Sequence, residues 1–311
     1  MAERARLCAL SVDLDEIRHY HAIHALRPAA PAADHAVYDR AVPRFLELAS
    51  AARVPLTLFV VGSDLSRAQN ATVLRRAAAE GHELGNHTLD HHYDLSRREP
   101  AEVERQIAAA NDAIAAHTGQ RPTGFRAPGY VVNDDVYRAL AATGMAYSSS
   151  VFPCPSYYTA KAAVIGGLYA LGRSSSSIVH HPGVLTAPTE PYRVGTPYYR
   201  RGAGLLELPI QVTPRLRLPV FGTVLSMLGP ALAPRLLGSL VGCELINLEL
   251  HGIDLLDRDD GLAELGKRQG DLRVPLERKW EVLTASIARL RQAGYAFVRL
   301  DEAARHFAAQ C

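Results

Sequence analysis

The chain has 311 residues, with 34 Lys and Arg against 32 Asp and Glu and a formal net charge of +2. Hydrophobic residues make up 48% and charged residues 21%, which is the balance of a folded globular protein and not of a disordered chain. The near-neutral charge gives no electrostatic basis for binding nucleic acid, so no nucleic-acid partner is expected. The four cysteines are scattered without a C-x-x-C spacing and indicate reduced thiols, not a disulfide framework.

Residues 1–6 lead directly into an apolar run, Leu7 to Val12, without a long apolar signal segment. A cytoplasmic protein is therefore expected. The run itself predicts a buried strand that carries Asp13 and Asp15 to its carboxyl end. Because side chains two residues apart on a strand point to the same side, the two carboxylates are expected to face one site.

The next elements alternate between helix and strand. The pattern predicts a helix over 36–52, a strand over 56–61, a helix over 67–79 and a short strand over 82–86. This short strand leads into a polar loop that holds His87 and His91. Two imidazoles at this spacing can ligate one metal ion, and with one Asp they form a facial triad that leaves positions open for water and substrate.

The alternation continues to the end of the chain. It predicts helices over 102–118, 134–143, 275–293 and 301–309, and strands over 124–126, 145–151, 205–212, 244–251 and 296–300. Alternating strands and helices predict one domain, residues 1–311, with a parallel sheet closed or nearly closed into a barrel. Arg126 and His251 then follow strand ends, where barrel enzymes place their chemistry.

Two segments interrupt this pattern. Residues 153–217 contain four consecutive serines and many Tyr and Pro residues, and predict a long irregular insertion whose tyrosines either stack on a sugar or pin the loop to the body. Residues 218–243 are apolar but broken by prolines and Arg235. We expect a buried helical hairpin there, with weak contact to a membrane or a lipid substrate as the alternative.

Four ordered motifs resemble those of the polysaccharide deacetylase family, the NodB-homology carbohydrate esterases of family 4. They are Asp13-Leu14-Asp15 for its Asp pair, His87 to His91 for its H-[ST]-x-x-H metal motif, Phe125 to Tyr130 for its R-x-P motif and Leu248 to His251 for its late L-x-L-H motif. The resemblance implies a distorted (β/α) barrel of the deacetylase type. It also implies that Asp15, His87 and His91 hold a divalent metal, Zn²⁺ by preference, with Asp13, Arg126 and His251 as catalytic residues.

Two departures bear on substrate and activity. The Leu between the two aspartates is typical of the intracellular subgroup, which includes peptidoglycan-deacetylase-like, allantoinase-like and lipid-linked deformylase-like members. Many relatives also carry an acidic residue after the fifth strand, whereas residues 147–153 contain none. The charge that this acid provides near Arg126 or His251 is either absent or supplied from elsewhere.

Chemistry and resemblance together predict the division of roles. The metal lowers the pKa of water and polarises an acyl carbonyl, Asp13 accepts a proton, Arg126 orients Asp13, and His251 protonates the leaving amine. The predicted activity is removal of an N-acyl group, N-acetyl by preference, from an amino sugar or glycoconjugate precursor. The alternatives are deformylation of a lipid-linked amino sugar, hydrolysis of an allantoin-type cyclic amide, and a catalytically silent sugar-binding barrel.

Overall fold

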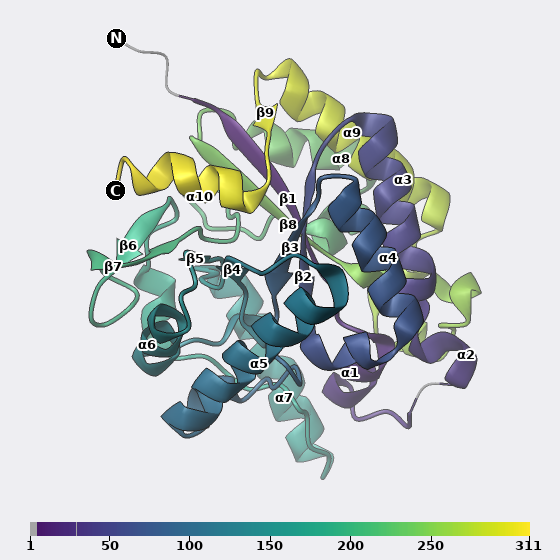
Figure 1. Cartoon of the computed structure of the whole chain (residues 1–311). Helices are drawn as coiled ribbons and strands as arrows, with labels where there is room; N and C mark the ends of the chain where they lie inside the picture. The colour runs from purple at the N-terminus through teal and green to yellow at the C-terminus, as the bar shows by residue number, and fades with distance from the viewer. Residues whose placement is uncertain (1–4, 29) are drawn as a thin grey trace.

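The computed structural model describes residues 5–28 and 30–311 and shows one curled sheet surrounded by helices (Figure 1). Its strands run in the order β6-β7-β5-β4-β3-β2-β1-β8, and β9 pairs with β1. The strands are β1 (Leu7–Asp13), β2 (Leu56–Val60), β3 (Glu83–Asn86), β4 (Gly124–Phe125), β5 (Tyr147–Ser148), β6 (Tyr192–Val194), β7 (Arg201–Glu207), β8 (Leu245–His251) and β9 (Ala296–Phe297). Except for the antiparallel β6–β7 pair, the strand pairs are parallel.

The sheet curls far enough that its two ends approach each other. After β7 the chain continues to Gln211, whose backbone N–H donates to Asn247 O on β8 at 3.2 Å. The Asn247 side-chain amide donates to the carbonyls of Leu208 and Pro209 at 3.0 and 3.1 Å. These contacts replace a regular ladder between the ends of the sheet, so the expected distorted (β/α) barrel is confirmed.

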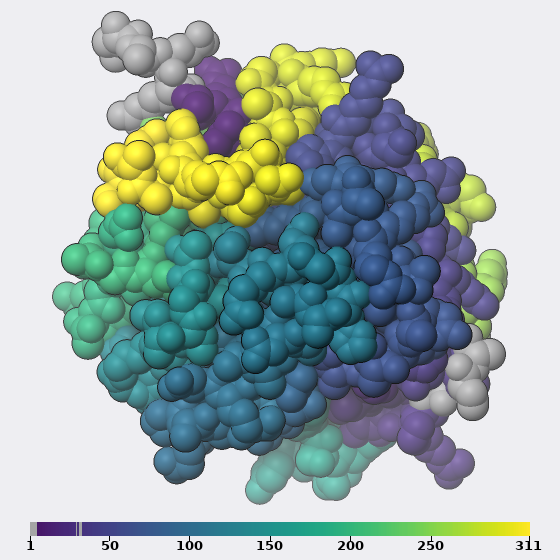
Figure 2. Space-filling model, viewed as in Figure 1, coloured from purple at the N-terminus to yellow at the C-terminus, as the bar shows by residue number. Residues whose placement is uncertain are grey.

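Helices cover the outside of the sheet. They are α1 (Ile17–Ile23), α2 (Pro31–Asp34), α3 (Val42–Ala52), α4 (Ala68–Ala79), α5 (Pro100–Thr118), α6 (Asp134–Ala142), α7 (Pro155–Ala170), α8 (Gly222–Gly238), α9 (Leu276–Gln292) and α10 (Leu300–Ala308). In the space-filling view, the blue and teal side chains of α4 and α5 and the yellow C-terminal segment hide the sheet (Figure 2). The largest apolar cluster lies between β1, β2 and β8 and helices α3, α4, α8 and α9. Both faces of these central strands are therefore buried, which explains their continuous apolar sequences.

Most predicted elements are present, but two expectations were wrong. The strand expected over 145–151 pairs only at Tyr147 and Ser148, because the backbone N–H groups of Ser150 and Val151 donate to the Glu207 carboxylate and not to a strand. The insertion expected to be irregular contains α7. Over 218–243, where a helical hairpin is expected, α8 consists of two helical segments joined at Gly229, where φ is 71° and Pro230 follows.

The residues that follow Asp15 form helix α1, which carries His19 and His21. No helix within residues 5–28 and 30–311 has the length and apolar content needed to cross a bilayer.

Candidate active site

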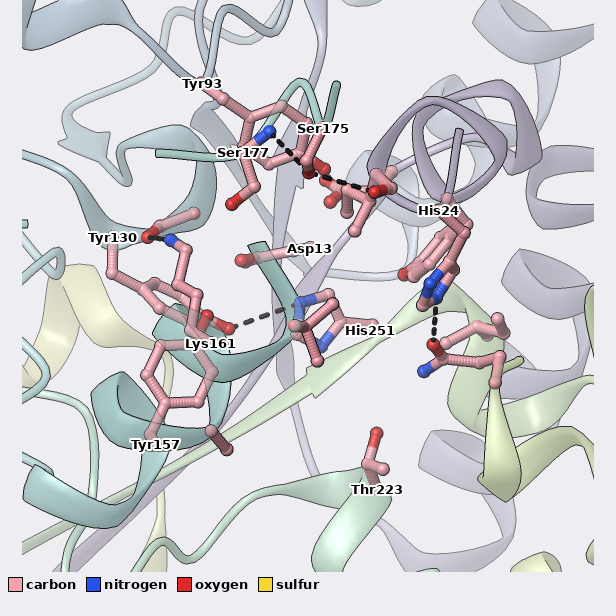
Figure 3. Close-up of a pocket in the computed structure, with 18 of the residues that line it drawn as sticks. Asp13, His24, Tyr93, Tyr130, Tyr157, Lys161, Ser175, Ser177, Thr223 and His251 are labelled. Carbon is pink, nitrogen blue, oxygen red and sulfur yellow. Dashed lines mark hydrogen bonds between the residues drawn. The ribbon is translucent and has the colours of Figure 1, made fainter. Parts of the chain in front are cut away.

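A cavity of about 310 Å³ opens at the carboxyl ends of the central strands. The strand register places Asp13 beside His251 on β8, and Asn86, which directly precedes His87, beside Phe125, which directly precedes Arg126. Figure 3 shows Asp13 and His251 directed into this cavity, with Tyr130, Tyr157 and Lys161 around it. Parallel pairing thus brings together residues that are far apart in sequence, because the carboxyl ends of parallel strands share one edge.

Asp15, His87 and His91 form a buried cluster. Asp15 Oδ1 lies 3.1 Å from His87 Nε2 and 2.9 Å from His91 Nε2. Burial alone would raise the pKa of Asp15, but the two imidazoles outweigh it and hold that pKa well below its ordinary value. The three residues therefore present an ionised carboxylate and two ring nitrogens to one point.

The hydrogen bond of His87 Nδ1 shows that this ring nitrogen carries a proton. His87 Nδ1 donates to the Arg126 carbonyl oxygen at 2.7 Å, and because a carbonyl can only accept, Nδ1 carries the proton. Nε2, which faces Asp15, is the nitrogen that can bind a cation. Asp15 Oδ1 and both ring nitrogens of His91 lack a conventional hydrogen bond to the rest of the described chain. Buried acceptors without donors fit a divalent cation, and one carboxylate with two imidazoles is a donor set that Zn²⁺ accepts.

The loop that carries the two histidines is held in a strained conformation. Thr88 and His91 have φ values of 67° and 54°, in the left-handed region that non-glycine residues rarely adopt. Asn86 Oδ1 accepts from the Thr88 N–H at 2.7 Å, and Thr88 Oγ1 accepts from the His91 N–H at 3.0 Å. The Gln106 side chain on α5 accepts from the Asp90 backbone N–H at 2.9 Å and donates to the Asp90 carboxylate at 2.7 Å. Side-chain hydrogen bonds thus compensate the backbone strain that turns both imidazoles inward.

Asp13 is joined to Arg126 by a buried ion pair. Arg126 Nη1 donates to Asp13 Oδ1 at 2.7 Å, and its other nitrogens donate to Ser11 Oγ, Ser149 Oγ and the Ser149 carbonyl. The guanidinium also lies 4.3 Å from the Phe59 ring centroid. Burial raises the pKa of Asp13 and Arg126 opposes that shift. Asp13 is therefore a carboxylate with increased basicity, held in one orientation.

Glu249, to which no sequence motif assigned a role, lies against His251. Glu249 Oε1 lies 2.9 Å from His251 Nδ1 and accepts from the Tyr130 hydroxyl at 2.9 Å. The Tyr130 oxygen lies 3.2 Å from His251 Nε2. Burial would lower the pKa of His251, but Glu249 outweighs it, and that pKa is well above its ordinary value of 6.5. Both ring nitrogens of His251 therefore face an oxygen, Nδ1 the Glu249 carboxylate and Nε2 the Tyr130 hydroxyl, an arrangement that favours the protonated imidazole.

Glu249 also accounts for the acid that residues 147–153 lack. It supplies the negative charge beside His251 from strand β8 itself. Burial would raise the pKa of Glu249, but the positive charges of His251 and Arg126 outweigh burial and lower that pKa. A sequence signal was available: Glu249 precedes His251 by two residues on a strand, so both side chains point to the same side. The group Asp13, Glu249 and His251 is close enough to resemble a second cation site. Because Arg126 and His251 already neutralise its carboxylates, we interpret it as a charge network.

The weaker candidates separate into two groups. His19 on α1 packs against His91 with ring centroids 4.0 Å apart, and His24 lines the cavity and contacts Gln269 Oε1 at 3.2 Å. Asp254 accepts from the His251 backbone N–H at 2.8 Å. Asp90 and His92 instead lie on the outer side of the loop, partly exposed and 3.8 Å apart. The latter two therefore do not reach the cavity.

Fold and site together define a class: an α/β barrel with a buried Asp, His, His cluster beside an Asp–Arg pair at the carboxyl ends of its strands. Comparison with known proteins is consistent with this class. The polysaccharide deacetylase family model matches residues 34–148, a range that contains His87, His91 and Arg126. Over this range the chain is similar to the polysaccharide deacetylase family.

Individual relatives match parts of the chain. A chitooligosaccharide deacetylase from Bradyrhizobium sp. (strain ANU 289) is 41% identical over 105 residues, which are 33% of this chain and 47% of that protein. One from Sinorhizobium fredii is 34% identical over 143 residues, 45% of this chain and 65% of that protein. The matches thus span about half to two thirds of these relatives. A solved structure from Mycobacterium smegmatis, assigned to the polysaccharide deacetylases, has a TM-score of 0.57 at 19% identity and covers 100% of this chain and 93% of that chain, which shows the shared fold.

Proposed function

We propose that this protein is a metal-dependent hydrolase that removes an N-acyl group, N-acetyl by preference, from an amino sugar or glycoconjugate precursor in the cytoplasm. The observation that carries the proposal is the His87 tautomer. Its Nδ1–H bond to the Arg126 carbonyl leaves Nε2 as a ligand beside Asp15 and His91, next to the Asp13–Arg126 pair. The relatives named as chitooligosaccharide deacetylases support the same reaction.

Asp15, His87 and His91 would hold the metal, which we propose to be Zn²⁺. When bound, such a cation supplies Lewis acidity that lowers the pKa of water and polarises an acyl carbonyl. The chain's part in this site is to keep three lone pairs directed at one point. Arg126 contributes to that through its carbonyl oxygen, which keeps the proton of His87 on Nδ1.

Asp13 and His251 would handle the protons. Asp13 accepts one from the attacking water, because burial raises its basicity while Arg126 holds it in place. His251 is the acid: Glu249 keeps it protonated, and it delivers a proton to the nitrogen of the leaving amine. The two groups face the same cavity from neighbouring strands, so base and acid act on opposite parts of one amide.

The cavity has the size and lining of a small-sugar site. Its volume of about 310 Å³ lies at the low end of ordinary ligand pockets. Tyr93, Tyr130 and Tyr157 offer aromatic surface to a sugar ring. Deformylation of a lipid-linked amino sugar is the second candidate, because Val164 and Ile165 of α7 form an apolar wall on one side of the cavity.

The test combines metal analysis with a substrate panel. We expect about one equivalent of Zn²⁺ per purified chain, lost in the His87→Ala/His91→Ala variant together with release of acetate or formate from N-acyl amino sugars. His92→Ala/His117→Ala is the matched control, since His92 and His117 lie outside the cavity. Equal zinc and equal turnover in both double variants would refute the assignment.

A further inference from the structure

In the described part of the chain, the large hydrophobic side chains that are exposed lie in two segments. Among the described residues, the large hydrophobic side chains that stand exposed are Val164, Tyr169, Leu171, Val179, Leu216, Leu218, Met227, Leu232 and Val241. The first four belong to α7 and the residues after it, and the others belong to 216–241. Surface hydrophobics gathered in this way mark an interaction surface more often than scattered ones do.

Helix α7 carries most of this exposure. Of the residues Pro155–Ala170, only Tyr158 is buried. Near the end of the helix, the side chains of Tyr169 and Leu171 are 83% and 74% exposed. A helix that is apolar on all sides is normally buried in a core or in lipid. Here the lower end of α7 projects from the edge of the molecule (Figures 1 and 2).

The segment of the sequence that contains α7 carries basic but no acidic side chains. The sequence has no Asp or Glu between Asp135 and Glu190, whereas it has Arg138, Lys161 and Arg173 there. In the parts of the chain that the structure describes, neither Lys161 nor Arg173 forms an ion pair with a carboxylate. They donate instead to the backbone carbonyls of Gly129 and Ala25. A second copy of this near-neutral chain offers no complementary acidic patch on this segment, whereas anionic lipid headgroups would complement the charge.

The same helix borders the active-site cavity. Ala160, Lys161, Val164 and Ile165 form one wall of the cavity. The C-terminal tail of α7 is tied to the opposite rim, since Ser175 Oγ donates to the Ile23 carbonyl at 2.9 Å. Ile165 of the cavity wall and the exposed Tyr169 are four residues apart on α7, so they lie on neighbouring turns of the same helix face.

We propose that α7 docks on an anionic lipid surface, with Val164, Tyr169 and Leu171 in the interface and Arg173 near the phosphate groups. Interfacial helices bind through buried apolar area together with attraction between basic residues and anionic lipids. Docking would place the mouth of the cavity at the membrane surface. It would give the proposed hydrolase access to amino sugars carried on lipids, and in this respect the inference rests on the proposed function.

The test is co-sedimentation of the full chain with vesicles. We expect binding to phosphatidylcholine vesicles that contain phosphatidylglycerol, little binding to phosphatidylcholine alone, and release by added salt. Tyr169→Asp/Leu171→Asp should weaken binding about tenfold or more, because each substitution places a charge where apolar surface is buried. Leu232→Asp/Val241→Asp is the matched control: these residues are also exposed and apolar, but Val241 lies near the amino-terminal end of β8, opposite His251.

Vesicle binding requires no turnover, so its result is independent of the proposed hydrolysis. Equal sedimentation with and without anionic lipid, or unchanged binding by the α7 variant, would overturn the proposal. A dimer in lipid-free solution that the α7 substitutions dissociate would assign the surface to a second copy and would overturn it as well. Turnover of a water-soluble N-acyl amino sugar should be unchanged in Tyr169→Asp/Leu171→Asp, which shows that the variant is folded.

Discussion

Replacement of Glu249 by Gln tests whether this residue supplies the charge that keeps His251 protonated. The substitution keeps the volume of the side chain and an oxygen that can accept from the Tyr130 hydroxyl, but it removes the negative charge 2.9 Å from His251 Nδ1. A hydrogen bond to a charged group contributes about 1.5–3 kcal/mol. At roughly 1.4 kcal/mol per tenfold change in rate, kcat should fall about 10- to 100-fold.

The pH dependence gives the sharper result. His251 acts as an acid only while protonated, so activity is lost as pH rises through its pKa. Glu249 holds that pKa well above the ordinary value of 6.5. In Glu249→Gln this charge is absent, so burial lowers the pKa of His251 unopposed by it. The alkaline limb of the kcat profile should therefore move to lower pH. Measurement of kcat across the pH range for the wild type and the variant gives both quantities.

Glu207→Gln is the matched control. Glu207 is also a fully buried glutamate, but it accepts from the Ser150 and Val151 backbones and from Tyr137, and it does not contact His251. Its replacement should change stability and leave the alkaline limb in place. An alkaline limb that does not move in Glu249→Gln, while circular dichroism shows a folded protein, would refute the reasoning.

Three further predictions concern residues that support the site and the barrel. Arg126→Lys keeps the charge but loses the fork that orients Asp13, so kcat should fall about 100-fold, with bound zinc unchanged by elemental analysis. Gly124→Ala would place a Cβ 2.1 Å from the Tyr147 ring, and displacing that ring should lower the free energy of unfolding in urea by about 2 kcal/mol or more. Burial raises the pKa of Glu83 to about 7, from an ordinary 4.5. The folded state therefore binds a proton more tightly than the unfolded state, and stability should fall by up to about 3 kcal/mol as pH rises from about 4.5 to 7.

Each of these has a result that contradicts it. An Arg126→Lys enzyme with wild-type kcat would show that the orientation of Asp13 does not limit the reaction. An unfolding midpoint of Gly124→Ala equal to that of the wild type would mean that the Tyr147 ring has room to move. Glu83→Gln should flatten the dependence of melting temperature on pH in the acid range. An unchanged slope in that variant would place the titration on another group.

The sequence alone was sufficient to predict the secondary structure that forms by local rules, and the fold class with it. Continuous apolar runs predicted β1 and β8 because these strands are buried on both faces. The 3.6-residue periodicity predicted α5, and Gly119 ends that helix with a left-handed φ of 79°. The six residues of the predicted site also lie at one end of the barrel, because each follows or ends a parallel strand.

Only the tertiary structure decided which groups those residues meet. The hydrogen bond from Tyr130 to Glu249 depends on how β8 lies against the turn after β4, more than a hundred residues away in the chain. The tautomer of His87 depends on the carbonyl of Arg126 from a neighbouring strand. The apolar residues of α7 have the composition of a core helix, yet packing leaves them exposed. Local sequence patterns determine which segments form strands and helices, but pairing register and side-chain packing determine charge, proton position and exposure.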